Sequence, residues 1–389
     1  MTLRIGLVAG EASGDILGAG LVTAIQTRYP DAEFRGIAGP RMVEAGVVPL
    51  FDADELAVIG LFEVLGRLPR LLRVRRELVA AMTTWRPDVF VGIDSPDFNL
   101  PVETRLRRAG LRTVHYVSPT VWAWRPGRVA TVARAADRVL CLLPFEPDYY
   151  DGIAEFVGHP LADRLAFDDA RRAQTRERLG FAGDAPVVAV LPGSRGSELK
   201  NLGAVFAGAV GKLGVDRVVA PMVNDRLAAR FARECERHAP GVPVVVTRED
   251  SRLIIEAADV VLTASGTATL ECLLLDRPMV VAYRLAPLTA WVLRTFGLLK
   301  IETFSLPNLL TGERVVPELI QENATPDRLA VALGLLLEDG DARAAQHAAF
   351  ARVREQLKTG ADERAAAAVL TVATTPNGTH GVRHQGDTL

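Results

Sequence analysis

Two carboxylates follow an apolar run in the segment PDVFVGIDSPDFNL, residues 87–100. The run Asp88–Ile93 is typical of a buried strand, and Asp94 and Asp97 come directly after it. A carboxylate at a strand end can take a proton from an attacking hydroxyl group, a role that accelerates reactions by about 10²–10⁴-fold. We therefore expect Asp94 to be a catalytic general base. Asp97 ranks second as the base, because an aspartate before a helix more often caps that helix. We expect Asp97 to contact the acceptor, the substrate that carries the attacking hydroxyl.

A phosphate-binding pattern occurs near residue 265. The apolar run Val260–Thr263 leads into a turn of small residues at the start of a predicted helix: Ser265, Gly266, Thr267, Ala268 and Thr269. Backbone N–H groups and the positive end of a helix dipole at such a turn suit a pyrophosphate. Glu271, near the first turn, is placed to accept hydrogen bonds from two ribose hydroxyls. The alternative is an ordinary strand-to-helix turn that serine and threonine cap.

The segment LPGSRGSE supplies a cation for the same chemistry. Gly193 and Gly196 allow the backbone to approach a ligand, and Arg195 between them presents a planar guanidinium group. In a doubly wound sheet this turn lies at the carboxyl edge of the strands, where ligands bind. We expect Arg195 to bind the diphosphate and Asn224, after a later strand, to reach the base or sugar. The alternative for Arg195 is an ion pair with a surface carboxylate.

Contacts with an acceptor or a lipid are predicted in three other segments. Glu11 and Ser13 lie in AGEASGD after the first strand, whereas Asp15 of that motif is assigned to helix capping. The segment VIGLFEVLGRLPRLLRVRREL mixes aliphatic residues with arginines, which suits anionic headgroups or a lipid phosphate. An ordinary amphipathic helix is the alternative there, and a packed loop is the alternative for VSPTVWAWRPGR. The candidates in these two segments are Arg67, Arg70, Arg73, Trp122 and Trp124.

These candidate residues need a scaffold that gathers strand ends. Short β-branched runs alternate with helical patterns along the chain, which predicts an α/β fold with parallel sheets. Both RIGLVAGEASGDILGAGL and VVAVLPGSRGSELKNLGAV have the pattern strand, Gly/Ser turn, helix. This repetition predicts two Rossmann-like domains facing a cleft, the layout of GT-B glycosyltransferases. The predicted domains are residues 1–160 and residues 161–374, the latter with the terminal helices, and the tail 375–389 is expected to be disordered.

Composition narrows the class of protein further. The 389 residues are 49% hydrophobic and 24% charged, and the net charge of −2 gives no reason to expect nucleic acid as a partner. Cys141, Cys235 and Cys272 lie in apolar runs without metal-ligand spacing, so no metal is expected. We expect neither a signal peptide nor a transmembrane span. Neither glycine turn matches a dinucleotide or Walker A pattern, so no cofactor is expected.

Nine motifs resemble those of one enzyme family, in the family's order, between Gly10 and about Leu310. They are GEASGD, GIDSPDFN, YVSPTVWAWR, LPFE, FVGHPLAD, LPGSRGSE, SGTATLE, PMVVAYR and SLPNLL. The chain is thereby similar to the lipid-A-disaccharide synthases of Gram-negative bacteria. The resemblance implies an inverting GT-B enzyme that joins UDP-2,3-diacylglucosamine to 2,3-diacylglucosamine 1-phosphate and releases UDP.

The resemblance also implies residue roles and a location. Asp94 would be the base for the acceptor 6-hydroxyl, and Arg195 would neutralise the departing diphosphate without a metal. The protein would be peripheral at the cytoplasmic face of the inner membrane, and a homo-oligomer is compatible with the sequence. One alternative is another GT-B enzyme, such as a UDP-sugar epimerase with a soluble substrate, which should lack an exposed apolar and arginine-rich surface. The other is a non-catalytic nucleotide-sugar binding protein, which needs no carboxylate at the strand edge.

Overall fold

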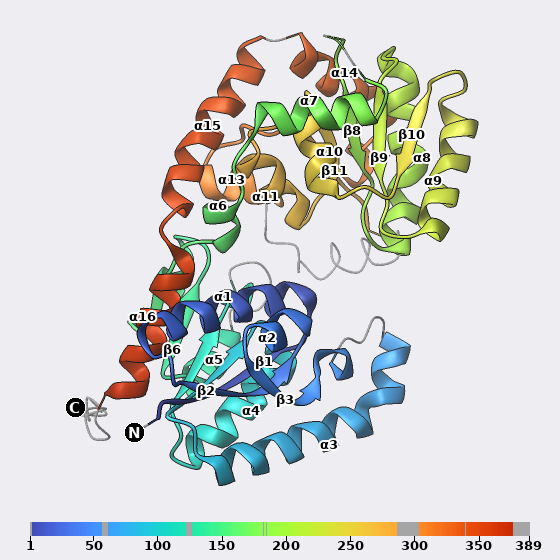
Figure 1. Ribbon diagram of the computed structural model, residues 1–389. Helices are drawn as coiled ribbons and strands as arrows, with labels where there is room; N and C mark the ends of the chain where they lie inside the picture. Colours follow the sequence, from blue (N-terminus) through green and yellow to red (C-terminus); the bar gives the residue numbers. More distant parts are fainter. Residues whose placement is uncertain are drawn as a thin grey trace, which may run out of the picture. The chain divides into compact units, whose positions relative to one another are not determined.

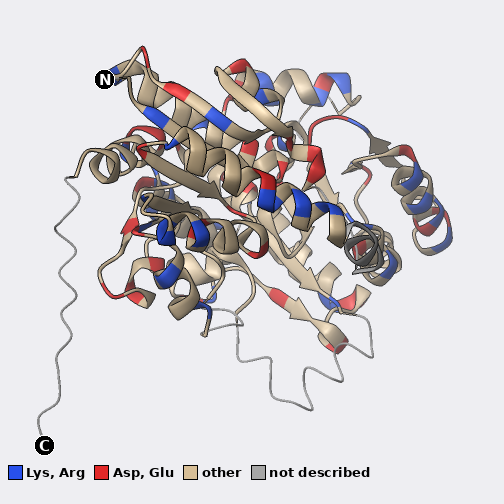
Figure 2. Ribbon diagram, turned by 90° about the horizontal axis from the view of Figure 1, so that it is seen from below, with Lys and Arg blue, Asp and Glu red and all other residues tan. Residues whose placement is uncertain are grey.

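The computed structural model describes residues 2–56, 61–121, 127–181, 183, 185–285, 303–338 and 340–375, and only the backbone of residues 61–67. The chain forms two compact units, Met1–Pro160 with Thr359–Leu389, and Leu161–Lys358. In each unit helices flank a sheet whose strand pairs are all parallel in the described residues (Figure 1). Charged residues of both signs are interspersed along the ribbon (Figure 2). The predicted α/β class with two parallel-sheet domains is confirmed.

The first unit contains a seven-stranded sheet in the order β3-β2-β1-β4-β5-β6-β7. Its strands are β1 (Arg4–Ala9), β2 (Glu33–Ala38), β3 (Val47–Asp52), β4 (Val89–Ile93), β5 (Thr113–Tyr116), β6 (Arg138–Cys141) and β7 (Ala154–Phe156). Its helices include α1 (Ala12–Arg28), α2 (Pro40–Glu44), α3 (Leu61–Trp85), α4 (Pro96–Arg108), α5 (Arg128–Ala135) and α16 (Ala361–Thr374). The winding direction reverses between β1 and β4, and doubly wound sheets bind ligands at this position.

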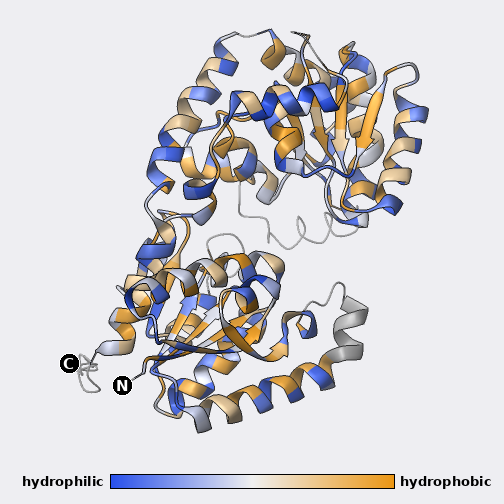
Figure 3. Ribbon diagram, in the orientation of Figure 1, coloured by the Kyte–Doolittle hydropathy of each residue, from blue (hydrophilic) through white to orange (hydrophobic). Residues whose placement is uncertain are grey.

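Alternating side chains of the central strands bury both faces of this sheet. Val89, Val91 and Ile93 of β4 pack in one core with α1 and α16, whereas Phe90 packs in another with α3 and α4. The five residues of β4 are therefore all buried, and hydrophobic colour is prominent on the sheets of both units (Figure 3). A continuous apolar run is the pattern expected of a parallel strand that is covered on both faces.

The last helix, α16, corrects the predicted domain limits. The sequence assigned residues up to 374 to the second domain, but α16 packs against α1 of the first unit. Ala365, Val369 and Ala373 lie in the core of that unit. An amphipathic pattern shows that a helix covers a sheet but not which sheet it covers, so this return of the chain was not predictable. The compact units divide after Pro160, and the predicted tail lies outside the described residues from 376 onward.

The second unit contains a six-stranded sheet in the order β10-β9-β8-β11-β12-β13. Its strands are β8 (Val188–Leu191), β9 (Val218–Pro221), β10 (Val244–Thr247), β11 (Val260–Ala264), β12 (Met279–Tyr283) and β13 (Glu318–Ile320). Its helices include α6 (Pro160–Arg164), α7 (Asp169–Arg178), α8 (Gly196–Leu213), α9 (Asp225–His238), α10 (Ser251–Ala257), α11 (Thr267–Leu274), α13 (Leu306–Thr311), α14 (Pro326–Leu337) and α15 (Asp341–Leu357). Here β8 and β11 flank the reversal of winding.

Candidate active site

A cavity of about 420 Å³ lies at the carboxyl ends of β8 and β11 in the second unit. These two strands are neighbours in the sheet, with Leu191 paired to Thr263, although about 70 residues separate them in the chain. Because parallel strands bring their carboxyl ends to one edge, the turns that follow them meet there. The cavity lining includes six of the predicted UDP-binding residues: Arg195, Ser265, Gly266, Thr267, Ala268 and Glu271.

The Arg195 turn has a fixed backbone and an accessible side chain. Arg195 is the N-cap residue of α8, and its N–H donates to Glu198 Oε2 over 3.1 Å. Gly193 has φ +111°, and a Cβ there would lie 2.3 Å from Glu198 Oε2, so this position requires glycine. The Arg195 side chain is 75% exposed, with one guanidinium nitrogen 3.9 Å from Glu198 Oε1. The guanidinium group is therefore accessible to an anion in the cavity.

The N-terminus of α11 forms another wall of the cavity. Gly266 is the N-cap residue, and no side chain in the described residues caps this helix end. Its first N–H groups therefore keep their capacity to bind an anion. Two hydroxyl groups stabilise the turn instead: Ser265 Oγ donates to the Phe304 carbonyl over 3.1 Å, and Thr269 Oγ1 to the Gly266 carbonyl over 2.7 Å. The Thr269 side chain is fully buried and Thr269 does not line the cavity, so its place in the predicted UDP-binding turn rests on the backbone of the turn.

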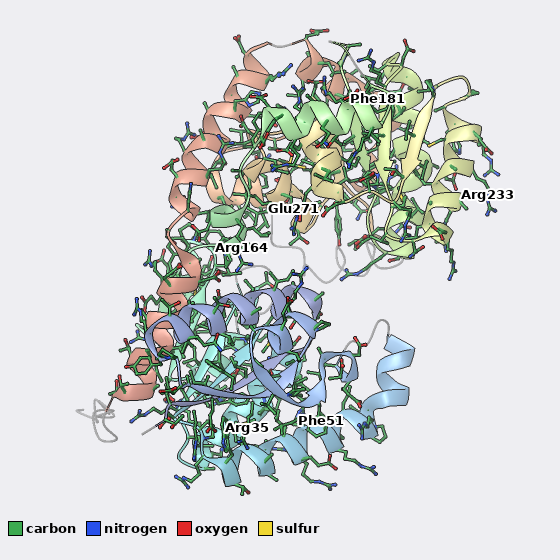
Figure 4. The ribbon with its side chains drawn as sticks, viewed as in Figure 1. Arg35, Phe51, Arg164, Phe181, Arg233 and Glu271 are labelled. Carbon is green, nitrogen blue, oxygen red and sulfur yellow. The ribbon has the colours of Figure 1, made fainter. Side chains whose placement is uncertain are left out.

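Glu271 reaches the same cavity with a partner that sequence reasoning missed. Arg252 of α10 donates from Nε to Glu271 Oε1 over 2.9 Å, and the Glu271 side chain is only 14% exposed. Figure 4 labels Glu271 on α11. The arginine offsets part of the carboxylate charge and fixes its orientation, and the spacing of 19 residues gives no local pattern that would identify this pair.

Asn224 has a helix-capping role that was not predicted from the sequence. It is the N-cap residue of α9, where its Oδ1 accepts the N–H of Leu227 over 2.9 Å. Its neighbour Val223 lines the cavity, but Asn224 is not among the lining residues. An asparagine followed by DRLAARF is a typical start of a helix, so the sequence contained the signal for capping.

Asp94 lies at the carboxyl end of β4 in the first unit, next to the end of β1. The N–H of Asp94 donates to the Tyr116 carbonyl over 2.8 Å, and Asp94 is half-buried. Asp94 and Ser95 have φ angles of +52° and +43°, an uncommon left-handed pair of non-glycine residues. Gly10 lies against this turn, since a Cβ at Gly10 would be 2.8 Å from Ser95 Oγ. Backbone strain of this kind is concentrated at functional sites.

Glu11 and Ser13 lie at the same sheet edge as Asp94. Both are exposed at the start of α1, and the register pairs Ala9 with Ile93, the residues just before these turns. Asp97 belongs to the first turn of α4, whose N-cap residue is Ser95, so the alternative of N-capping by Asp97 does not apply. The Asp97 side chain is 86% exposed and forms an ion pair with Arg128. These positions suit contacts with a second substrate more than structural roles.

Asp15 has the capping role that the sequence assigned to it, but for α2 rather than for its own helix. Its two carboxylate oxygens accept the N–H groups of Arg41 and Met42 over 2.9 and 3.0 Å, and Asp15 is 3% exposed. We expect Asp15→Ala to lower the free energy of unfolding by about 1–3 kcal/mol, because the buried N–H group of Met42 and the partly buried N–H group of Arg41 lose their acceptor. Asp15→Asn retains one acceptor oxygen and should lose less. Denaturant unfolding measures both, and equal stability of the alanine variant would contradict this role.

Arg70 and Arg73 of α3 are both exposed, and Arg70 is held by an acidic partner. Arg70 donates to both oxygens of Glu55 over 3.0 and 2.6 Å, and this pairing raises the pKa of Arg70. Arg73 is exposed beside Leu68 and Leu72, which are 43% and 49% exposed. None of the helices in the described residues combines the length and hydropathy that a bilayer-spanning segment needs. The side chain of Arg67, and both Trp122 and Trp124, lie outside the described residues.

Solved structures share this architecture. Acinetobacter baumannii MurG aligns with a TM-score of 0.60 and 14% identity over 95% of this chain and 100% of its own. A UDP-GlcNAc 2-epimerase from Neisseria meningitidis, solved with UDP-GlcNAc bound, aligns with a TM-score of 0.60 and 10% identity over 92% of this chain and 99% of its own. At these identities the likeness shows the fold alone, and it confirms the predicted GT-B class.

Sequence comparisons extend the likeness from fold to family. A family model described as lipid-A-disaccharide synthetase matches residues 5–372. The lipid-A-disaccharide synthase of Sodalis glossinidius is 50% identical over 376 residues, which cover 95% of this chain and 97% of that protein. That of Pseudomonas aeruginosa is 49% identical over 374 residues, with 95% and 97% covered. The chain therefore belongs to the lipid-A-disaccharide synthase family, and it is a glycosyltransferase of lipid A biosynthesis.

Proposed function

We propose that this glycosyltransferase transfers 2,3-diacylglucosamine from UDP to the 6-hydroxyl of 2,3-diacylglucosamine 1-phosphate. The observation that carries the proposal is the cavity in which Arg195 and the uncapped N-terminus of α11 occur together, in a chain of this family. A guanidinium group and a helix N-terminus are a suitable combination for a diphosphate leaving group. Glu271, which Arg252 holds in place, is suited to the ribose hydroxyls of UDP.

The reaction requires a proton acceptor and a stabilised leaving group. Asp94 takes the proton of the acceptor 6-hydroxyl as its oxygen attacks the anomeric carbon of the donor. The bond between that carbon and the β-phosphate oxygen breaks, its electron pair leaves with UDP, and the configuration inverts to a β linkage. Arg195 and the N–H groups of α11 stabilise the charge that develops on UDP. Glu11, Ser13 and Asp97 are proposed to contact the acceptor.

The proposal is tested with the purified full chain and both diacylated substrates. We expect one disaccharide 1-phosphate to form for each UDP released, and we expect EDTA to leave the rate unchanged because Arg195 and α11 supply the positive charge. An epimerase would instead convert the nucleotide sugar without an acceptor. A binding protein would retain UDP and release no product, so either result would contradict the proposal.

We also propose that α3 contacts the cytoplasmic face of the inner membrane through Leu68, Leu72 and Arg73. Exposed leucines beside an exposed arginine suit partial insertion among anionic headgroups. The double substitution Leu68→Ser with Leu72→Ser should weaken binding to vesicles containing phosphatidylglycerol by at least about tenfold, because two buried leucines contribute more than about 1.4 kcal/mol.

A matched control for the membrane prediction exists on α14. Leu335 is 54% exposed, close to the exposure of Leu72, but it belongs to the second unit. Leu335→Ser should leave vesicle co-sedimentation unchanged. Equal binding by the α3 double variant and the wild type would exclude α3 as the contact surface, and equal losses in both variants would indicate a general effect of surface hydrophobicity.

A further inference from the structure

A buried polar row lies directly beneath the turn that carries Asp94. Asn99 and Glu103 are one helical turn apart on α4, His115 is on β5, and all three are fully buried. Glu103 Oε1 and His115 Nδ1 are 2.8 Å apart. A Cβ at Gly92 would lie 2.0 Å from Glu103 Oε1 and 2.9 Å from Asn99 Cβ, so the absence of a side chain at Gly92 lets this row pack against β4.

The Asn99 amide is directed at the backbone on both sides of Asp94. Its Nδ2 donates to the Ile93 carbonyl over 3.2 Å and to the Asp94 carbonyl over 2.8 Å. Carbonyl oxygens only accept hydrogen bonds, so this position requires a group with two N–H donors. Together with the bond from the Asp94 N–H to the Tyr116 carbonyl, these contacts fix both peptide groups that flank the Asp94 Cα.

These hydrogen bonds offset the strain of the turn. A left-handed conformation is unfavourable for a non-glycine residue, and both Asp94 and Ser95 adopt it. The two hydrogen bonds from Asn99 to the carbonyls of Ile93 and Asp94 favour this backbone conformation and so act against the strain. A buried polar side chain is unfavourable unless its polar atoms are hydrogen-bonded. The Oδ1 of Asn99 has no partner in the described part of the chain, so the two hydrogen bonds from its Nδ2 carry the stabilising role of this side chain. Within the described residues, the donors of Asn99 are used only on the carbonyls of Ile93 and Asp94.

We propose that Asn99 is a positioning residue for this reaction, which acts by holding the Asp94 carboxylate in its catalytic orientation. This inference rests on the proposed function of Asp94 as the base. Glu103 and His115 extend the row away from Asp94 and have a packing role. Burial raises the pKa of Glu103, although His115 opposes this effect. Asn99 lies inside the motif GIDSPDFN, but spacing alone did not show that its amide faces back to the turn.

The test is a double-mutant cycle between Asp94 and Asn99. Asn99→Leu keeps a similar volume and removes both donors, and we expect kcat to fall about 10–100-fold with little change in the KM for the nucleotide sugar. Glu103→Gln is the matched control in the same row, and its kcat should stay within about threefold of the wild type. If Asn99 acts through Asp94, the variant with both Asp94→Asn and Asn99→Leu is as slow as Asp94→Asn alone.

Each outcome of the cycle separates this inference from the proposed function. Independent effects that multiply in the double variant, or an unchanged kcat in Asn99→Leu, would overturn the positioning role. An unchanged kcat in Asp94→Asn would instead overturn the assignment of the base. Thermal unfolding of all variants shows whether they are folded, and Asn99→Ser replaces Asn99→Leu if the leucine does not fit. If kcat in Asn99→Ser and Glu103→Gln falls in proportion to the loss of thermal stability in each variant, the effect is one of general destabilisation. That result would also overturn the positioning role.

Discussion

Replacement of Asp94 by asparagine is expected to reduce kcat by about 10²–10⁴-fold, the usual contribution of a general base. Asparagine has nearly the same shape, and the backbone contact of residue 94 with Tyr116 does not involve the side chain. The fold and the turn should therefore persist. Initial rates of disaccharide formation at saturating concentrations of both substrates measure the effect, and thermal unfolding verifies that the variant is folded.

Asp97→Asn is the matched control for this prediction. Asp97 is three residues away in the same motif, its side chain is 86% exposed, and it pairs with Arg128. A change in acceptor contact should affect KM for the acceptor and leave kcat within about threefold of the wild type. A larger loss of kcat in Asp97→Asn than in Asp94→Asn would reverse the assignment of the two carboxylates.

Replacement of Arg195 by alanine should reduce kcat by about 10²–10³-fold, the loss typical of removing one group that stabilises transition-state charge. The Arg195 guanidinium group reaches the cavity that the N-terminus of α11 also lines, so its removal leaves less positive charge for the departing UDP. The backbone bond from Arg195 N–H to Glu198 survives the substitution. Steady-state rates give kcat, and UDP affinity should fall as well because the product carries the same charge.

Arg233→Ala controls for the loss of a positive charge on the second unit. Arg233 is exposed on α9, hydrogen-bonds to the Ala229 carbonyl of its own helix, and points outward from that helix (Figure 4). Its substitution should leave both kcat and UDP affinity unchanged. Similar losses in Arg195→Ala and Arg233→Ala would indicate a long-range effect of net charge and no specific role for Arg195.

Much of the candidate site could be predicted from sequence, because the turns that follow neighbouring parallel strands all lie at the same edge of the sheet. The strand-then-turn patterns near Arg195 and Ser265 each marked the carboxyl end of a strand, and the doubly wound topology placed β8 beside β11. The same argument placed Glu11 near Asp94, since β1 and β4 are neighbours. No contact between distant residues had to be known in advance.

Other features depended on tertiary contacts that leave no local signal. The edge strand β3 has no clear strand pattern in the sequence, because VVPLFD contains a proline and is largely exposed and so lacks the apolar alternation of a strand. Arg252 donates to Glu271, and Asn99 donates to the Ile93 carbonyl. Only the packing of the helices brings these partners together. The capping role of Asn224 was overlooked for a different reason, because its signal was local and was outweighed by its place near the strand edge.

The central claim is that the two chemical roles reside in different residues: Asp94 activates the acceptor, and Arg195 with α11 binds the diphosphate. The most direct test is the dissociation constant of UDP, measured by titration calorimetry for the wild type, Asp94→Asn and Arg195→Ala. We predict that Asp94→Asn binds UDP within about twofold of the wild type and that Arg195→Ala binds it at least about tenfold more weakly, a difference of about 1.4 kcal/mol. Equal weakening in both variants, or wild-type affinity in Arg195→Ala, would contradict this division of roles.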